Sequence, residues 1–334
     1  MNVLKFLSVF AIFAIFVVVV NANGLDIDYY KYSCPKVEEI SKRITEQYVG
    51  HVPNLAPGLL RMHFHDCIVR GCDASVLLDP TPSNNQTEKD TVPNSTLRGF
   101  EVINAIKGAL EKECPGVVSC ADVLSLAARD AIVTINGPYW HVPLGRKDGI
   151  ISLASEALAN IPSPFANIST LKQNFAAVGL TSKDLVVLSG TICIYLFAHT
   201  IGIGHCFIIQ GRLYNFTGKG DTDPKLSPSY ASWLKTMCPK VTGDRKSFVS
   251  MDRITPRVFD EKYFTMVTQR RGLFESDAAL LEDSETKTYI ETQVYTQGAT
   301  FAKDFAESAT KMSMIGVLTG SLGHVRKTCG VVKY

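Results

Sequence analysis

Arg61 and His65 lie four residues apart in the stretch 59–67, which reads LLRMHFHDC. If this stretch is helical, the two side chains share one face. Arginine stays protonated at physiological pH, whereas histidine titrates near neutrality. A fixed cation beside a proton acceptor suits a reaction that moves one proton while negative charge develops on a leaving oxygen.

A solvated helix face is the plain alternative for this pair. Leu59, Leu60, Phe64 and Ile68 flank it, however, so the segment is expected to be partly buried. A buried arginine without a role is costly, which weakens the alternative. The spacing alone does not identify the reaction.

A group of oxygen donors follows directly. It consists of Asp66, Asp73 and Ser75. Gly71 permits a close approach of the backbone, and Cys67 and Cys72 could close the loop into a rigid cradle. Calcium takes six to eight oxygen ligands, main-chain carbonyls included. A turn with solvated acids stays open as the alternative on these residues alone.

The elements that must position these residues are predicted to be helices. Apolar residues recur at helical spacing within 100–110, 123–131, 171–178, 260–268 and 300–314, while strand alternation is scarce. Ser119 is a candidate N-cap, and Asp122 stands where the acid of a capping box would be. Gly179 is expected to end the helix over 171–178. We expect one all-α domain of two lobes with a site between them.

Near the start of the chain of 334 residues, Lys5 precedes an apolar run over residues 6–20. This run is short for a membrane span, which needs about 20 residues, so it predicts a signal peptide over residues 1–22. Residues 23–334 would form the mature domain. The formal charge of only +2 gives no indication of a nucleic-acid partner or an anionic membrane.

Nine cysteines are consistent with an oxidising compartment. Cys67 and Cys72 are the only close pair, and no second pair faces them, which disfavours zinc. Sequons begin at Asn85, Asn94, Asn167 and Asn215. Both features favour the secretory route.

The stretch from Arg61 to Ser75 closely resembles the distal haem motif of the secretory (class III) plant peroxidases. Further motifs of that family occur in order along almost the whole mature chain. They are YSCP at 32–35, EK at 88–89, RGFE at 98–101, VSCAD at 118–122, AARD at 127–130, PLGRKD at 143–148, TP at 255–256, FD at 259–260, SD at 276–277 and LTG at 318–320.

The resemblance implies the plant-type haem peroxidase fold, with haem b between two helical lobes. It implies that His65 takes a proton from bound hydrogen peroxide and returns it to the departing oxygen, while Arg61 stabilises the charge. Asn94 would hydrogen-bond His65 and keep it basic, and Glu88 would extend this network. If Asn94 is buried behind His65, its sequon should carry no glycan.

On the other side of the haem, the resemblance makes His199 the iron ligand. Asp277 would hydrogen-bond that imidazole and raise its basicity. Pro162 corresponds to the family's proline at the exposed haem edge, where aromatic donors bind. The implied substrates are hydrogen peroxide and small phenolic donors, which are oxidised in one-electron steps.

Two calcium ions and four disulfides are implied as well. The distal ligands would be Asp66, Val69, Gly71, Asp73 and Ser75, with Glu88 beside them. The proximal ligands would be Thr200, Asp252, Thr255, Val258 and Asp260. The disulfides would be Cys34–Cys114, Cys67–Cys72, Cys120–Cys329 and Cys206–Cys238, which leaves Cys193.

We expect a secreted monomer of the extracellular space or cell wall, free of the membrane once the signal is removed.

The sequence departs from the family at residues 191–197, TICIYLF, which look like an insertion between Gly190 and the Ala198–His199 pair. Continued as helix, seven residues would shift the following chain by about 10 Å. We expect a bulge that restores the register.

The alternative function is a peroxidase-fold protein with impaired or absent haem binding. A third interpretation, a calcium- or zinc-dependent hydrolase that uses His65 and Asp66, is disfavoured because the sequence lacks the motifs of such enzymes. Ile68 and Asn136 replace the common Phe and Gly and should be tolerated.

Overall fold

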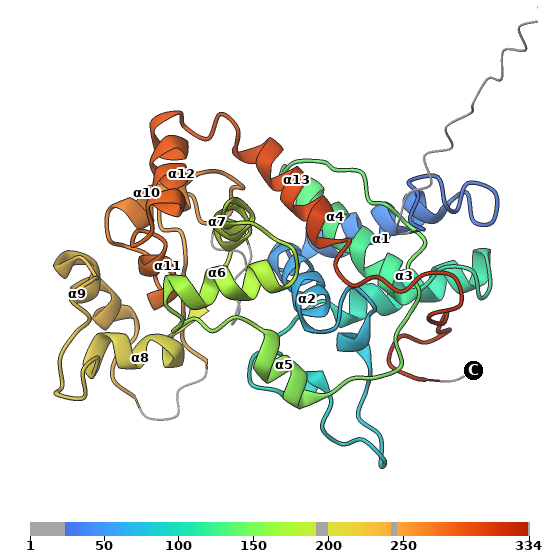
Figure 1. The fold of residues 1–334 in the computed structure, drawn as a ribbon, viewed down its shortest axis with the longest axis horizontal. Helices are drawn as coiled ribbons and strands as arrows, with labels where there is room; N and C mark the ends of the chain where they lie inside the picture. The colour runs from blue at the N-terminus through green and yellow to red at the C-terminus, as the bar shows by residue number, and fades with distance from the viewer. Residues whose placement is uncertain (1–23, 192–199, 242–245, 333–334) are drawn as a thin grey trace, which may run out of the picture.

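The computed structural model describes residues 24–191, 200–241 and 246–332, and these are almost entirely helical (Figure 1). The first group of elements is α1 (Val37–His51), α2 (Leu55–Val69), η1 (Ser75–Leu77), η2 (Glu88–Asp90), α3 (Phe100–Glu113), α4 (Cys120–Thr134) and α5 (Ala154–Asn160). The second is α6 (Ile168–Ala177), α7 (Ser182–Thr191), β1 (Ile203–His205), α8 (Cys206–Tyr214), α9 (Pro228–Met237), β2 (Phe248–Ser250), α10 (Lys262–Thr268), α11 (Glu275–Ala279), α12 (Ser284–Tyr295) and α13 (Phe301–Met312).

The elements form two lobes, as expected. In Figure 1, α1, α3 and α4 lie on one side and α8–α12 on the other, with α2, α6, α7 and α13 between them. The all-α prediction is confirmed for the described residues, except for one small sheet in which β1 and β2 pair antiparallel. The predicted helices over 171–178, 260–268 and 300–314 correspond to α6, α10 and α13. None of the described helices is both long and apolar enough to cross a bilayer.

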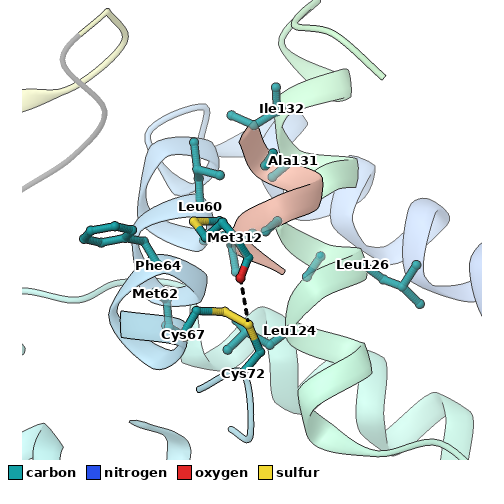
Figure 2. Packing of buried hydrophobic residues seen from close by; sticks show 14 of the residues in the cluster. Leu60, Met62, Phe64, Cys67, Cys72, Leu124, Leu126, Ala131, Ile132 and Met312 are labelled. Carbon is teal, nitrogen blue, oxygen red and sulfur yellow. Dashed lines mark hydrogen bonds between the residues drawn. A yellow bond between two sulfur atoms is a disulfide. The ribbon is translucent and has the colours of Figure 1, made fainter. Parts of the chain in front are cut away.

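Helix α2 lies in the centre of the larger core, and every one of its residues is buried. It packs against α4, and Figure 2 shows Leu60 and Met62 of α2 together with Leu124 of α4 and Met312 of α13. Burial on all sides explains why the segment carries apolar residues all round rather than on one stripe. The polar side chains of α2 are therefore held in a dry environment.

The four predicted disulfides are present with the predicted pairing, Cys34–Cys114, Cys67–Cys72, Cys120–Cys329 and Cys206–Cys238. They close spans of 80, 5, 209 and 32 residues, respectively. Cys193 lies outside the described residues. His63 lies beside Cys67 and Cys72, but both sulfurs are oxidised and cannot act as thiolate ligands. This group is therefore no zinc site.

The N-terminus of α4 shows one confirmed prediction and one wrong one. Ser119 caps the helix by accepting a hydrogen bond from the Asp122 amide (3.1 Å). The Asp122 carboxylate does not turn back as a capping-box acid. It accepts hydrogen bonds from Tyr30 (2.8 Å) and from the buried guanidinium of Arg146 (2.9 Å). A long-range charged partner therefore replaces the local cap.

Two backbone positions need unusual dihedral angles. Asn136 has φ +63°, where the family commonly has glycine, and asparagine is among the residues that tolerate this region best. Gly71 has φ +104°, and a Cβ there would lie 2.4 Å from the carbonyl oxygen of Gly316. Gly71 therefore allows the loop after α2 to pack directly against the C-terminal segment.

Candidate active site

Arg61 and His65 are neighbours on α2, as their spacing predicts. The Nε of Arg61 donates a hydrogen bond to the Nε2 of His65 over 3.2 Å. Arg61 is 1% exposed and His65 is 0% exposed. A cation and an imidazole are thus placed side by side away from bulk water, where electrostatic interactions are strong.

Asn94 fixes the tautomer of His65. The side-chain nitrogen of Asn94 donates to the main-chain oxygen of Glu88 (2.9 Å), which orients its amide oxygen towards the Nδ1 of His65 (2.5 Å). An amide oxygen only accepts and a guanidinium only donates. His65 must therefore carry its proton on Nδ1 and keep a lone pair on Nε2, beside Arg61.

Burial lowers the pKa of His65 well below its usual value, and the charge of Arg61 lowers it further, while the hydrogen bond to Asn94 opposes the shift. The imidazole is therefore neutral at physiological pH. A neutral imidazole can accept a proton on Nε2 and later return it, which is general base and then general acid catalysis.

Two further groups hold Arg61, and the sequence did not single them out. The Nη1 of Arg61 donates to the hydroxyl of Thr96 (3.1 Å), and its Nη2 donates to the main-chain oxygen of Pro93. Both partners belong to the same loop as Asn94. This loop therefore positions both the cation and the base, and only the motif around Asn94 indicated it beforehand.

The oxygen donors after α2 converge on one place. Asp66 accepts hydrogen bonds from the amides of Ala74 (2.9 Å) and Val76 (3.4 Å), and Asp73 accepts one from the amide of Ser75 (2.9 Å). The carbonyl of Gly71 accepts the amide of Asp73 in a tight turn. The carbonyl of Val69 accepts the side-chain amide of Asn160 (2.9 Å).

The same cluster contains buried oxygens without a well-aligned hydrogen-bond partner among the described residues. They are the hydroxyl of Ser75 and both carboxylate oxygens of Glu88. Burial raises the pKa of Glu88 to about 8 and raises the pKa values of Asp66 and Asp73 as well. Unpaired oxygens among buried acids are costly, and a hard cation would relieve that cost. The cluster fits calcium.

The second predicted calcium group also converges. The hydroxyl of Thr200 donates to the main-chain oxygens of Asp260 (2.7 Å) and Val258 (3.3 Å). The hydroxyl of Thr255 lies 3.0 Å from a carboxylate oxygen of Asp252 and 3.0 Å from one of Asp260. All five residues offer oxygen atoms, so this group fits calcium too.

The predicted iron ligand His199 lies outside the described residues, as do residues 192–197 of the insertion. The residues on either side are described, and the amide of Thr200 donates to the carbonyl of Gly190 over 2.9 Å. Without residues 191–197, Gly190 and Thr200 would be three positions apart, and this bond would be that of an ordinary turn. The contact is the one expected if the register is restored.

Asp277 is buried, 1% exposed, and accepts hydrogen bonds from Tyr263 and from the amide of Phe274, both over 2.8 Å. Pro162 is buried in the loop between α5 and α6. The carbonyl of Pro164 in that loop accepts the amide of Ser276, next to Asp277, over 3.0 Å. The loop expected at the haem edge is thus tied to the helix that bears Asp277.

These features define a helical protein with a buried acid–base pair on one element and two groups of oxygen atoms whose chemistry fits a cation. A family model described as peroxidase matches residues 38–295. The chain is 53% identical to Peroxidase 1 of Arabidopsis thaliana over 307 residues, which are 91% of each chain. It is 50% identical to Peroxidase 27 of Arabidopsis thaliana over 309 residues, 92% of each.

A rice relative gives the same result. Peroxidase 1 of Oryza sativa subsp. japonica is 48% identical over 321 residues, which are 94% of this chain and 95% of the relative. The chain therefore belongs to the peroxidase family, and it is a peroxidase. The hydrolase interpretation of His65 and Asp66 is not favoured, nor is the alternative of impaired haem binding.

Asn94 should carry no glycan although it begins a sequon. Its side chain is 3% exposed, and the nitrogen that would bear the sugar donates to Glu88. Asn85, Asn167 and Asn215 are exposed and serve as internal references. Glycopeptide mapping of protein expressed through the secretory route should find position 94 unmodified. A glycan there would contradict the position of Asn94 behind His65.

Calcium removal should destabilise the protein more at pH 8 than at pH 5. In calcium-free protein the fold raises the pKa of Glu88 from 4.5 to about 8, so the folded state favours the protonated carboxyl. The free energy of unfolding therefore falls as the pH rises from 4.5 to about 8. Bound calcium favours the ionised carboxylate instead. Melting temperatures with excess chelator or excess calcium, at both pH values, measure this.

Glu88→Gln should weaken the pH dependence measured in chelator, because one of the three buried acids whose pKa values are raised is gone. Glu291→Gln, at an exposed position on α12, should leave that dependence unchanged. An equal effect of calcium at pH 5 and pH 8 in the wild-type protein would refute the assignment of Glu88 to a cation site.

Proposed function

We propose that the protein is a secreted haem peroxidase that reduces hydrogen peroxide and oxidises phenolic donors by one-electron steps. The observation that carries this proposal is the neutral His65, with its Nε2 lone pair beside the guanidinium of Arg61. Reducing a peroxide requires one proton to move from one oxygen to the other and requires charge to be stabilised on the departing oxygen. This pair supplies both functions.

The residues present suit a haem group. His199 would hold the iron, and Asp277, whose two oxygens both accept hydrogen bonds, would orient and polarise that imidazole. On the opposite side, the guanidinium of Arg61 donates to neutral acceptors on His65, Thr96 and Pro93, and its positive charge would stabilise negative charge beside the Nε2 of His65. When bound, the haem would supply the redox centre for peroxide and donor.

The protein's own residues would act in sequence. The Nε2 of His65 accepts the peroxide proton and later delivers it to the departing oxygen, which leaves as water. Arg61 stabilises the negative charge as the oxygen–oxygen bond weakens. Asn94 keeps the proton of His65 on Nδ1 throughout, so that Nε2 remains the basic atom. Pro162 and its loop would border the site for aromatic donors.

Two calcium ions would hold the scaffold, one at Asp66, Val69, Gly71, Asp73, Ser75 and Glu88 and one at Thr200, Asp252, Thr255, Val258 and Asp260. Residues 1–22 would be removed as a signal peptide, which leaves residues 23–334 as a monomeric enzyme outside the cell. The four disulfides support an oxidising destination.

Replacing the acid–base pair should abolish most of the activity but leave haem binding intact. His65→Leu should lower peroxide-dependent phenol oxidation by about 10²–10⁴-fold and Arg61→Leu by about 10²–10³-fold. His51→Leu, at the exposed end of α1, is the matched control and should be unchanged. Stopped-flow rates at equal Soret absorbance measure this, and a wild-type rate in His65→Leu would refute the proposal.

Deleting residues 191–197 should yield a folded protein that retains haem at least as well as the full chain. The bond between Gly190 and Thr200 would become an ordinary turn bond, so neither flank needs to move. Soret absorbance per mole and melting temperature of the two proteins measure this. If only the full-length chain binds haem, the seven residues are an integral part of the site.

A further inference from the structure

A cavity of about 300 Å³ lies in the lobe formed by α8–α12 (Figure 1). Its lining comes from α8, from the loop before α9, from the end of α10 with the residues that follow it, and from α11 with the turn after it. None of the residues assigned above to peroxide chemistry or to calcium belongs to this lining. An apolar cavity of about 150 Å³ holds a benzene ring, so this one has room for a ring with a short substituent.

Arg212 of α8 is the buried cation of the lining, and it is 3% exposed. Its Nε donates to the carboxylate of Asp223 over 2.5 Å, and its Nη1 donates to the carbonyls of Gly272 and Phe274 over 2.7 Å each. Among the described residues, none accepts a hydrogen bond from its Nη2. Because a guanidinium carries five N–H donors, three contacts fix Arg212 in place while Nη2 keeps its donors for an acceptor in the cavity.

Apolar side chains form much of the wall. Val267 of α10 is buried, and Ala278 of α11 and Leu281 in the following turn are partly buried. A small inorganic anion bound to Arg212 would leave these side chains in contact with water. A ligand with an apolar body would cover them, and burying apolar surface is favourable. The wall therefore favours an anion that carries an apolar body.

The charges of the exposed rim leave one cation without a carboxylate partner. Lys225 is paired with Glu282, as Arg212 is with Asp223. Arg270 also lines the cavity, but its side chain donates to two main-chain oxygens of the loop before α9. In the part of the chain that the structure describes, no acid lies within ion-pair distance of Arg270. This surplus of one positive charge matches a ligand with a single negative charge.

The backbone holds Arg270 at the rim. Its φ is +57°, in the left-handed region that residues other than glycine adopt rarely. The carbonyl of Arg270 accepts the amide of Ser227, the N-cap of α9, over 2.8 Å, and its amide donates to the carbonyl of Val267 over 2.9 Å. Such conformations persist where the surrounding structure enforces them, and they cluster at ligand-binding sites.

One further acid lies near the cavity. Burial raises the pKa of Glu275, and the positive charges of Arg212 and Lys225 oppose that rise. Glu275 forms an ion pair with neither cation in the described contacts, and it does not belong to the lining. An anion in the cavity would therefore not contact this carboxylate.

We propose that the cavity is a binding site for a small carboxylate whose apolar body is the size of one aromatic ring. The carboxylate accepts hydrogen bonds from the Nη2 of Arg212 beside the charge of Arg270, and the ring lies against Val267, Ala278 and Leu281. Such a ligand stabilises the folded state by mass action, because the unfolded chain has no such cavity. The inference is independent of the proposed function, since it uses none of the residues assigned to peroxide chemistry.

Calorimetric titration of the full-length, haem-reconstituted protein with trans-cinnamate, in the absence of peroxide, tests the chemistry of the ligand. Cinnamate should bind, and its neutral analogue cinnamamide should bind roughly tenfold more weakly, because hydrogen bonds to a charged acceptor are the stronger ones. Acetate and inorganic phosphate, which have no apolar body, should also bind more weakly. Cinnamamide or phosphate binding as tightly as cinnamate would overturn the inference.

Variants locate the ligand. Ala278→Leu fills the cavity and should weaken cinnamate binding about tenfold or more, whereas Ala302→Leu, at an exposed position of α13, should not change it. Arg270→Gln should weaken binding about two- to fivefold, and Lys287→Gln, exposed on α12, should leave it unchanged.

If Ala278→Leu does not fold, Leu281→Phe fills the same cavity from the neighbouring turn and should give the same loss. Wild-type affinity in a folded cavity-filling variant would mean that cinnamate binds elsewhere, and it would overturn the inference. A wild-type protein without a Soret band would overturn the proposed function but would still bind cinnamate at this cavity. The two failures are therefore distinguishable.

Discussion

The hydrogen bond between His65 and Asn94 is the interaction on which the rest of the site depends. It joins helix α2 to the loop that follows η2, and it decides which imidazole nitrogen is basic. Asn94 in turn is oriented by the main chain of Glu88, whose carboxylate belongs to the oxygen cluster. The basicity of His65 and the order of the oxygen cluster around Glu88 are therefore connected through Asn94.

Helix α2 places unusual demands on the fold, because it buries Arg61, His65 and Asp66 within two turns. Each buried polar group must have partners or the fold is destabilised by several kcal/mol. The partners come from both sides: the loop around Asn94 supplies them for Arg61 and His65, and the segment just after the Cys67–Cys72 disulfide supplies the amides of Ala74 and Val76 to Asp66. This explains why the disulfide, the loop and the oxygen cluster all adjoin one helix.

The sequence predicted this arrangement in part. The spacing of Arg61 and His65 established their shared helix face, and the resemblance to a family gave the disulfides, which no spacing could. Thr96, Pro93 and Tyr263 were missed, because a hydroxyl or carbonyl that meets its partner only after folding carries no local pattern. Asp122 is the opposite case, in which a local pattern predicted a contact that a long-range partner replaced. Its position predicted a local cap, but a buried Arg146 lies close enough to outcompete a neighbouring amide.

The described segments on either side of residues 192–199 are each anchored by contacts of their own. Helix α7 is fixed near its start by Asp184, which accepts hydrogen bonds from Thr181 and from Ser308 of α13. Thr200 is fixed by the carbonyls of Val258 and Asp260. With both ends anchored, lengthening the connection from two residues to nine costs closure entropy on the order of only 1 kcal/mol. The described contacts therefore fix the positions of α7 and Thr200, whereas the closure entropy depends only weakly on the number of residues that connect them.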